Sequence, residues 1–171
     1  MAELGIAAFS GSKLPQLKSC AKLTSAQLFC HAQTKLMIPP FDERGYLPQG
    51  IYEPTWDDFW ERFGTNNYRK QLLTGLRLAL GNLKLAGCRR VYIGGSFITD
   101  KERPNDYDGC FDIFGIDEDA IDPIFLQPDL AAQRTKFGGE LVPNPAMAGF
   151  FQTDKNGNPK GIIVLDPTTI P

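Results

Sequence analysis

The chain has 171 residues, of which 42% are hydrophobic and 22% are charged, and its formal net charge is −2. This length and composition are typical of one globular domain, and the balanced charge excludes a strong basic field for non-specific binding of nucleic acid. No apolar run approaches the roughly 18–20 residues of a membrane-spanning helix, so no membrane partner is expected.

Residues 1–36 differ in composition from the rest of the chain, because they contain four lysines and a single acidic residue, Glu3. We expect a poorly ordered N-terminal extension, or upstream sequence translated from too early a start, since Met37 is itself a possible start codon. A targeting segment is the alternative, although the long apolar region of a signal peptide is missing. Residues 37–171 are expected to form a single domain.

The four cysteines, Cys20, Cys30, Cys88 and Cys110, form no Cys-x-x-Cys pair, and His31 is the single histidine. A zinc site of usual spacing is therefore not expected. Disulfides would be possible in a secreted chain, but nothing else in the sequence indicates secretion. We interpret the cysteines as reduced thiols and expect a cytoplasmic protein.

A first helix is predicted to begin after Thr55, which is a good N-cap and is followed three residues later by Asp58. Its aromatic residues recur at helical spacing, and Gly64 is well placed to end it. The aromatic residues are Trp56, Phe59, Trp60 and Phe63. An aromatic stripe can stack on nucleobases, but this spacing favours packing in the core.

A second helix is predicted over residues 67–86, with a buried leucine stripe and Gly87 as its C-terminal stop. Its basic residues fall on the other faces and are expected to be solvated. These residues are Arg69, Lys70, Arg77 and Lys84.

Three further elements are predicted towards the C-terminus. Residues 117–122 form an acidic stretch that we expect to be a solvated loop, and residues 129–137 form a helix ended by Gly138 and Gly139. Residues 150–153 and 161–166 are expected to pair as a β-hairpin around a turn at residues 154–158.

The segment with the clearest chemistry is residues 91–113, VYIGGSFITDKERPNDYDGCFDI. A short apolar strand is followed by a turn containing Gly95 and Ser96, and then by Asp106 and Asp108. Because strand side chains at i and i+2 point to the same face, the two carboxylates can lie side by side while Tyr107 points away. Clustered carboxylates suit a Mg²⁺ ion that carries phosphates, and a glycine turn can offer its amides to phosphate oxygens.

A structural alternative exists for Asp106 and Asp108, since the sequence Pro-Asn-Asp-Tyr-Asp-Gly is also typical of a turn with local Asx hydrogen bonds. If both carboxylates are partly buried, their repulsion predicts either a bound cation or a raised pKa.

This arrangement resembles the core motif of the nucleotidyltransferase superfamily, in which an apolar strand leads to Gly-Ser and, after a spacer, to Asp-x-Asp. The matching residues are Gly95, Ser96, Asp106 and Asp108. The resemblance implies an α+β fold with a mixed β-sheet flanked by helices. It also implies that Asp106 and Asp108 are catalytic residues that bind Mg²⁺.

Nucleotide binding is implied for Gly95 and Ser96, which would hold the β- and γ-phosphates. Lys101 and Arg103 lie in the spacer and could reach the same phosphates, although each is also an ordinary loop cation.

Active members of that superfamily usually supply a third carboxylate from a later strand. The sequence leaves Glu140, Asp154 and Asp166 open for this role. Asp112 is too distant, because it lies about 13 Å beyond Asp108 along a strand that rises ~3.3 Å per residue.

A longer stretch, residues 37–166, is similar to a family of small bacterial proteins of unassigned function that are described as nucleotidyltransferase-like. The similarity is carried by MIPPFDERGYLPQGIYEPTWDDFWERFGTN, RRVYIGGSFITDKERPNDYDGC, FGGELVP and FFQTDKNGNPKGIIVLD.

These resemblances predict a Mg²⁺-dependent protein that transfers a nucleotidyl group from an NTP to an unknown acceptor, which could be a protein, an RNA end or a small molecule. By analogy with small stand-alone members, a toxin–antitoxin or defence context is expected. The alternative is a catalytically inactive module that keeps the fold and binds a nucleotide or a protein partner.

Overall fold

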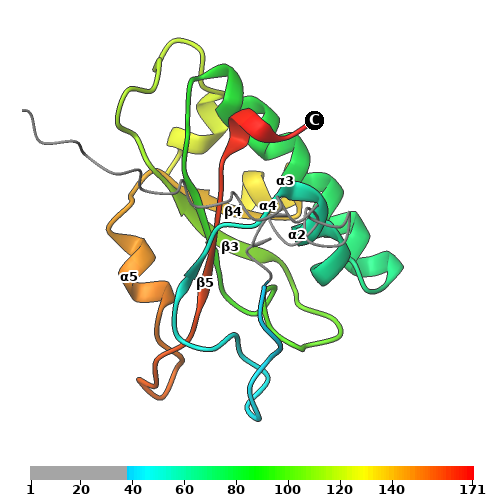
Figure 1. Cartoon of the computed structure of the whole chain (residues 1–171). Helices are drawn as coiled ribbons and strands as arrows, with labels where there is room; N and C mark the ends of the chain where they lie inside the picture. The colour runs from blue at the N-terminus through cyan, green and yellow to red at the C-terminus, as the bar shows by residue number, and fades with distance from the viewer. Residues whose placement is uncertain (1–37) are drawn as a thin grey trace, which may run out of the picture. The chain divides into compact units, whose positions relative to one another are not determined.

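The computed structural model describes residues 38–171, and this part of the chain builds one mixed sheet with helices against it (Figure 1). The expected N-terminal extension, with Cys20 and Cys30, lies outside the described residues, so these expectations stay predictions.

The sheet has five strands in the order β1-β5-β2-β3-β4. They are β1 (Ile51–Tyr52), β2 (Val91–Gly94), β3 (Tyr107–Phe111), β4 (Gly139–Val142) and β5 (Ile162–Leu165). The central strand β2 is antiparallel to β3 and β5, whereas each outer pair, β1–β5 and β3–β4, is parallel. The expected mixed sheet flanked by helices is therefore confirmed.

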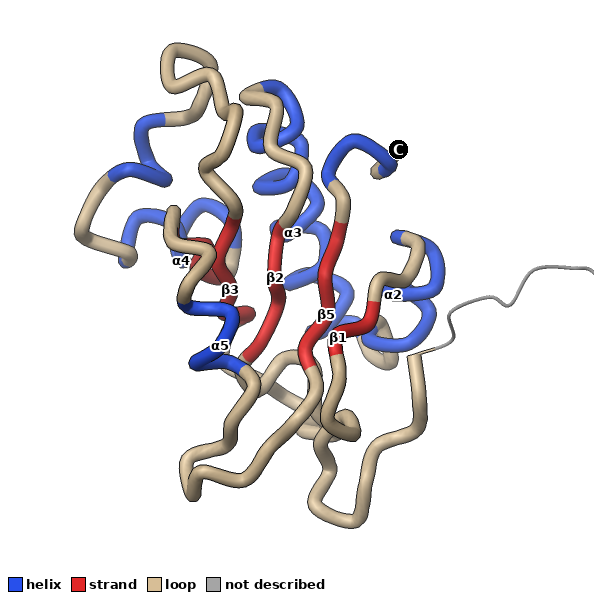
Figure 2. Tube along the Cα trace, turned by 60° about the vertical axis from the view of Figure 1, so that its left-hand side comes forward, coloured by secondary structure: helices blue, strands red, loops and turns tan. Residues whose placement is uncertain are grey.

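Helices lie on both faces of this sheet (Figure 2). One face, here called the core face, packs against α2 (Trp56–Phe63), α3 (Asn67–Leu85) and α4 (Ala131–Phe137). The other face carries the short helix α5 (Met147–Phe151), whose Phe151 ring packs against Gly94. Two 3₁₀ turns, η2 (Pro123–Leu126) and η3 (Pro167–Thr169), complete the described elements.

The two long predicted helices form as expected. Thr55 caps α2, because its Oγ1 accepts a hydrogen bond from the Asp58 amide at 3.2 Å, and Asn66 caps α3 in the same way. The aromatic stripe of α2 packs into the core, with Phe59 and Phe63 fully buried, which confirms the packing interpretation.

Strand alternation separates the two faces of β3. Tyr107 and Phe111 are buried in the cluster beneath the helices, so Asp108 and Cys110 between them point to the face that carries α5. Cys88 and Cys110 are both buried free thiols, as expected. Among residues 38–171, no helix has the length and apolar character needed to cross a membrane.

Two predictions are wrong. Residues 150–153 do not form a strand, because Asn144 starts a helical turn by accepting a hydrogen bond from Met147 N, and α5 continues to Phe151. Thr153 makes an isolated bridge to Pro159 instead. Arg69 is not solvated, since only 2% of its surface is exposed.

The predicted helix over residues 129–137 is confirmed but begins at Ala131, whose amide donates a hydrogen bond to the Asp129 side chain.

Candidate functional site

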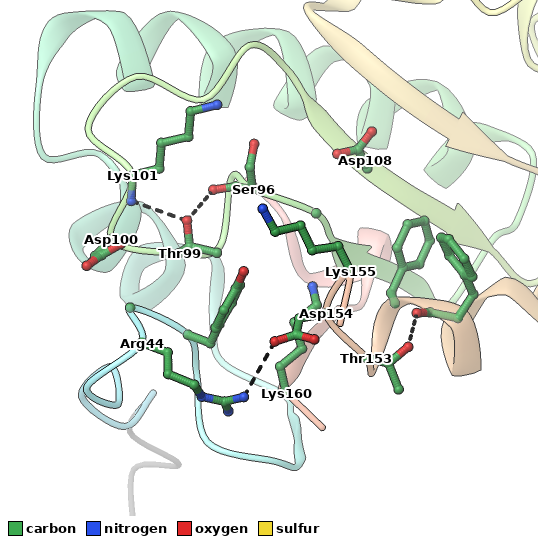
Figure 3. Close-up of a pocket in the computed structure, with 15 residues that line it drawn as sticks. Arg44, Ser96, Thr99, Asp100, Lys101, Asp108, Thr153, Asp154, Lys155 and Lys160 are labelled. Carbon is green, nitrogen blue, oxygen red and sulfur yellow. Dashed lines mark hydrogen bonds and ion pairs between the residues drawn. The ribbon is translucent and has the colours of Figure 1, made fainter. Parts of the chain in front are cut away.

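A cleft of about 700 Å³ opens beside the glycine turn that follows β2 (Figure 3). Five segments line it: the loop before β1, the loop after β2, strand β3, the end of α5, and the turn before β5. Their lining residues are Arg44, Gly45, Tyr46, Gly95, Ser96, Thr99, Asp100, Lys101, Asp108, Phe150, Phe151, Thr153, Asp154, Lys155 and Lys160.

The glycine turn approaches Asp108 closely. Gly95 has a φ of 65°, in the left-handed region, and a Cβ at this position would collide with the Asp108 carboxylate. Within residues 38–171, the amides of Gly95 and Ser96 donate no hydrogen bond, while the Ser96 carbonyl accepts one from Thr99 Oγ1 at 2.7 Å. The turn therefore presents two amides that can donate to an anion.

Buried Arg69 fixes the loop that continues from this turn. Its guanidinium donates to the carbonyls of Phe63 (2.6 Å), Lys101 (2.7 Å) and Phe97. It also lies over the Phe97 ring, 4.7 Å from the centroid. Because one side chain from α3 satisfies three carbonyls, the loop is held against the helix as a defined wall of the cleft.

Asp106, Asp108 and Glu140 form a group of neighbouring carboxylates, of which Asp108 lines the cleft. Asp108 pairs in register with Glu140 of the parallel strand β4, so both side chains point to the same face, and Asp106 precedes β3 by one residue. Burial, followed by the negative charges of Asp106 and Glu140, raises the pKa of Asp108 to about 6. This shift is what clustered, partly buried carboxylates are expected to produce.

Arg134 of α4 joins two of these carboxylates. Its Nε lies 3.4 Å from Asp106 Oδ2, and its Nη2 forms an ion pair with Glu140 Oε1. The Arg134 side chain is 54% exposed, so it reaches the carboxylates from the solvent side. Among residues 38–171, no group of three or more His, Cys, Asp or Glu side chains is arranged to hold a metal ion.

Three lysines also line the cleft. Lys101 and Lys155 are exposed, and in Figure 3 the Lys155 side chain extends towards Ser96. Lys160 also lines the cleft but is only 6% exposed. The cleft lining thus combines the carboxylates of Asp100, Asp108 and Asp154 with the ammonium groups of Lys101, Lys155 and Lys160.

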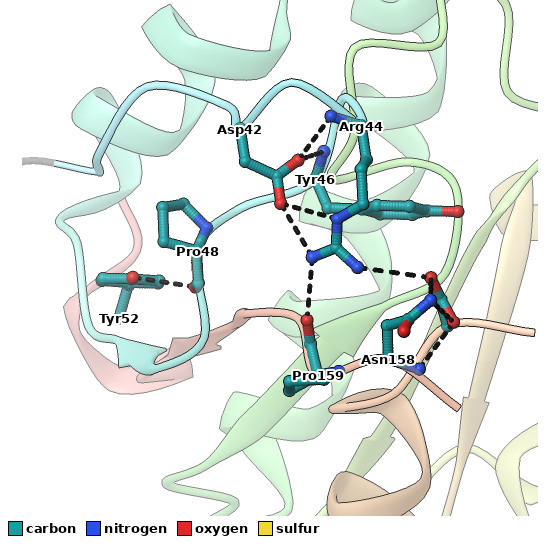
Figure 4. Close-up of polar contacts among 8 residues, drawn as sticks. Asp42, Arg44, Tyr46, Pro48, Tyr52, Asn158 and Pro159 are labelled. Carbon is teal, nitrogen blue, oxygen red and sulfur yellow. Dashed lines mark hydrogen bonds and ion pairs between the residues drawn. The ribbon is translucent and has the colours of Figure 1, made fainter. Parts of the chain in front are cut away.

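Arg44, in contrast, is engaged by the protein itself (Figure 4). Its Nη2 lies 2.8 Å from Asp42 Oδ2 and donates to the Pro159 carbonyl at 3.0 Å, and its Nη1 lies 3.5 Å from Asp154 Oδ2. These contacts tie the loop before β1 to the turn before β5, so Arg44 shapes the cleft.

A family model described as a family of unknown function, DUF6932, matches residues 39–166. The chain belongs to DUF6932. No curated protein and no solved structure matches it. The expectation of a family of unassigned function is therefore met, while the relation of this DUF6932 chain to nucleotidyltransferases stays a prediction.

The structure brings together four of the six site residues that the sequence of this DUF6932 chain indicates. Gly95, Ser96, Lys101 and Asp108 line the cleft. Asp106 lies outside this lining and pairs with Arg134. Arg103 is also absent from the lining and lies over the Tyr68 ring, 4.8 Å from its centroid.

Among the open candidates for a third carboxylate, Glu140 is the one that adjoins Asp108. Asp154 instead accepts hydrogen bonds from the amides of Asn156 and Asn158, and Asp166 caps η3. Arg134, Lys155 and Lys160 were not expected at the site from the sequence. Arg134 and Lys160 carry no sequence signal beyond their charge, because their roles depend on tertiary contacts.

Proposed function

We propose that this protein is a Mg²⁺-dependent nucleotidyltransferase that uses an NTP to modify an acceptor such as a protein, an RNA end or a small molecule. The observation that carries the proposal is the in-register pairing of Glu140 with Asp108, beside Asp106. A third carboxylate is the feature that active members of the superfamily usually supply and that the sequence left open, so its presence beside Asp108 supports the proposal.

The phosphate-binding part of the proposal rests on the glycine turn. The amides of Gly95 and Ser96 have no acceptor within residues 38–171, and the Ser96 side chain lines the same cleft as Lys101. Amides in a glycine turn can approach phosphate oxygens closely, and a nearby ammonium offsets their charge. These groups would bind the β- and γ-phosphates.

The carboxylates suit a Mg²⁺ ion that arrives with the nucleotide. Mg²⁺ is commonly held by one or two carboxylates together with substrate phosphates, so Asp106 and Asp108 would be its protein ligands. Their mutual repulsion, which contributes to the raised pKa of Asp108, would be relieved by a cation. When bound, the ion would neutralise charge that develops on the leaving pyrophosphate.

In this proposal Glu140 acts on the acceptor. Its carboxylate is 12% exposed and is held by Arg134. In the proposed reaction the acceptor oxygen or nitrogen forms a bond to the α-phosphorus, the bond to pyrophosphate breaks, and Glu140 takes the acceptor's proton.

Phe150 gives the cleft a feature that suits a nucleobase. Its side chain is 68% exposed, although it lines the cleft at the end of α5. An exposed aromatic ring can stack on a base without selecting among bases. This supports a nucleotide ligand over a simple polyphosphate.

A second candidate function is a non-catalytic module that binds a nucleotide or a protein partner. The observation that favours it is Arg134, whose guanidinium already neutralises Asp106 and Glu140. A cation supplied by the chain itself can take the structural place of a metal ion.

One experiment separates these functions. Wild-type protein and Asp108→Asn are incubated with Mg²⁺ and each NTP labelled at the α-phosphate, alone and with lysate, and transfer of the label is measured. Binding of a non-hydrolysable NTP to the two proteins is measured separately by calorimetry. We expect label transfer by the wild type only. We also expect binding to the variant to be weaker by about tenfold or more, judged against the 10–100-fold cost of losing an outer-shell partner.

Asp119→Asn, which removes an exposed carboxylate from another loop, is the matched control. Binding without transfer would favour the non-catalytic module. If the wild type binds no NTP at millimolar concentration, both nucleotide-based functions fail.

A further inference from the structure

Lys160 is a buried cation without an ionic partner in the described chain. Only 6% of its surface is exposed, yet its side chain lines the cleft (Figure 3). Within residues 38–171, its ammonium makes neither a hydrogen bond nor an ion pair. It makes a cation–π contact with Tyr46, in which Nζ lies 5.8 Å from the ring centroid. The residue is enclosed over most of its surface, while its ammonium is not among the fully buried atoms that lack a partner, so it can pair with a ligand in the cleft.

The surrounding carboxylates do not supply that partner. Asp108 and Asp154 are the two acids whose charges act on Lys160, and neither forms an ion pair with it. Asp154 is committed to Asn156, Asn158 and Arg44. Burial lowers the pKa of Lys160, and the charges of these two acids oppose that shift.

The backbone holds Lys160 in this position. Its amide donates to the Gln152 carbonyl at 2.8 Å, and the next amide, that of Gly161, donates to the Leu47 carbonyl at 2.9 Å. A bridge between Thr153 and Pro159 closes the turn immediately before it. The ammonium is therefore presented to the cleft from a fixed backbone, which reduces the entropic cost of binding a ligand.

The other donors of the cleft indicate what kind of ligand this is. The open amides of Gly95 and Ser96 lie across the same cleft, and the exposed ammonium groups of Lys101 and Lys155 flank it. Donors spread over a cleft of about 700 Å³ suit an anion with several charges and many oxygens along its length. A single carboxylate would satisfy only one of them.

We propose that Lys160 binds the phosphate chain of a polyphosphate ligand, and that it does so without a metal ion. The inference rests on the proposed function only for the nucleoside part of that ligand. Lys160 and the glycine turn line the same cleft, so a phosphate chain bound there can contact both the ammonium group and the backbone amides.

The test uses inorganic tripolyphosphate in the presence of EDTA, so that neither a nucleoside nor a metal contributes. Affinity is measured by calorimetry for the wild type, Lys160→Met and Lys155→Met. Lys160→Met keeps the length of the side chain and removes its charge, and we expect it to weaken binding by about tenfold or more. Lys155→Met removes an exposed charge from the same turn and should weaken binding by about threefold or less.

A second measurement separates ligand binding from a structural role. If Lys160 serves the ligand, its unpaired charge costs stability, and Lys160→Met should melt at the same temperature as the wild type or higher. In the wild type, tripolyphosphate should protect Lys160 from reductive methylation, as followed by mass spectrometry, which needs no variant. Equal binding by Lys160→Met, absence of binding by the wild type, or absence of protection would each overturn the proposal.

Failure of the Lys160 proposal and failure of the proposed function give different results. Tripolyphosphate binding that depends on Lys160, without binding of Mg²⁺–NTP, would keep the phosphate-binding role and reject nucleotidyl transfer. Nucleotidyl transfer that is unaffected in Lys160→Met would keep the proposed function and reject the phosphate-binding role of Lys160.

Discussion

The Asp108 carboxylate packs against the Cα of Gly95, so closely that no side chain fits between them. Gly95 also has a positive φ of 65°. Two independent constraints, space and backbone conformation, therefore require glycine at the point where the turn meets the carboxylate group. This contact joins Asp108 to the turn whose amides are proposed to bind phosphate.

Gly95→Ala is expected to damage both stability and ligand binding. The left-handed conformation and the collision with Asp108 together should lower the free energy of unfolding by about 2 kcal/mol or more. Gly81→Ala is the matched control, since a Cβ there meets nothing within 4 Å and the residue lies inside α3. That substitution should stabilise the protein by roughly 0.5–1 kcal/mol. Urea denaturation measures both, and a Gly95→Ala protein as stable as the wild type would refute the close contact.

The pH dependence of stability should carry the signature of Asp108. Its pKa is raised from 3.8 to about 6 in the folded protein, so between these values the native state binds more protons than the unfolded state. The stabilisation from this group is complete below about pH 4 and is lost as the pH rises through about 6. Asp108→Asn stays neutral throughout, so its stability relative to the wild type should increase from pH 4 to pH 7.

The measurement is urea denaturation at half-unit pH steps. Asp119→Asn serves as the control, and its stability relative to the wild type should vary less over this range. A difference between Asp108→Asn and wild type that is independent of pH would show that Asp108 is not buried among like charges.

Local sequence patterns were sufficient to predict the helices α2 and α3 and the part of the site formed by Asp108 and the glycine turn. The cap at Thr55 and the apolar spacing set the position of α2, and strand alternation placed Asp108 on the face opposite to Tyr107. The glycine turn was recognisable because paired glycines immediately after an apolar strand favour a tight turn with a positive φ, which other residues adopt only with strain.

The remaining site residues depend on tertiary structure that no local pattern encodes. Glu140 adjoins Asp108 because of the register between two parallel strands, which is set by the connection through α4. Lys160 precedes an apolar strand, as many solvated lysines do, and its burial arises from packing of the loop before β1. Residues 150–153 were misassigned because the pair of phenylalanines favours a strand, whereas Asn144 starts a helical turn further upstream.

Arg69→Met should test whether the loop after β2 depends on its clamp. The substitution removes hydrogen bonds to the carbonyls of Phe63, Phe97 and Lys101 and leaves buried acceptors unsatisfied. We expect a loss of about 3 kcal/mol or more in the free energy of unfolding, and weaker binding of tripolyphosphate. Lys70→Met changes the exposed neighbour on the same helix and should stay within about 0.5 kcal/mol of the wild type. Equal effects of the two substitutions would contradict the clamp.

Arg134→Met should make the three neighbouring carboxylates, Asp106, Asp108 and Glu140, a stronger cation site. Without the guanidinium, Asp106 and Glu140 lose their ion pairs, and repulsion among three carboxylates should lower the melting temperature at pH 7.5. A divalent cation can replace the missing charge, so added Mg²⁺ should raise the melting temperature of Arg134→Met more than that of the wild type.

The matched control for Arg134→Met is Lys136→Met, which removes another cation of α4, one that pairs with Asp122 at 2.6 Å. It should show no additional response to Mg²⁺, because Asp122 lies in a different ion pair and has no comparable group of carboxylates around it in residues 38–171. Thermal scans in EDTA and in 10-fold steps of Mg²⁺ concentration provide the comparison, with NaCl of equal ionic strength to exclude simple screening. If Arg134→Met and wild type respond equally to Mg²⁺, the guanidinium does not occupy the place of a metal ion. In that case the non-catalytic module loses the observation that favours it.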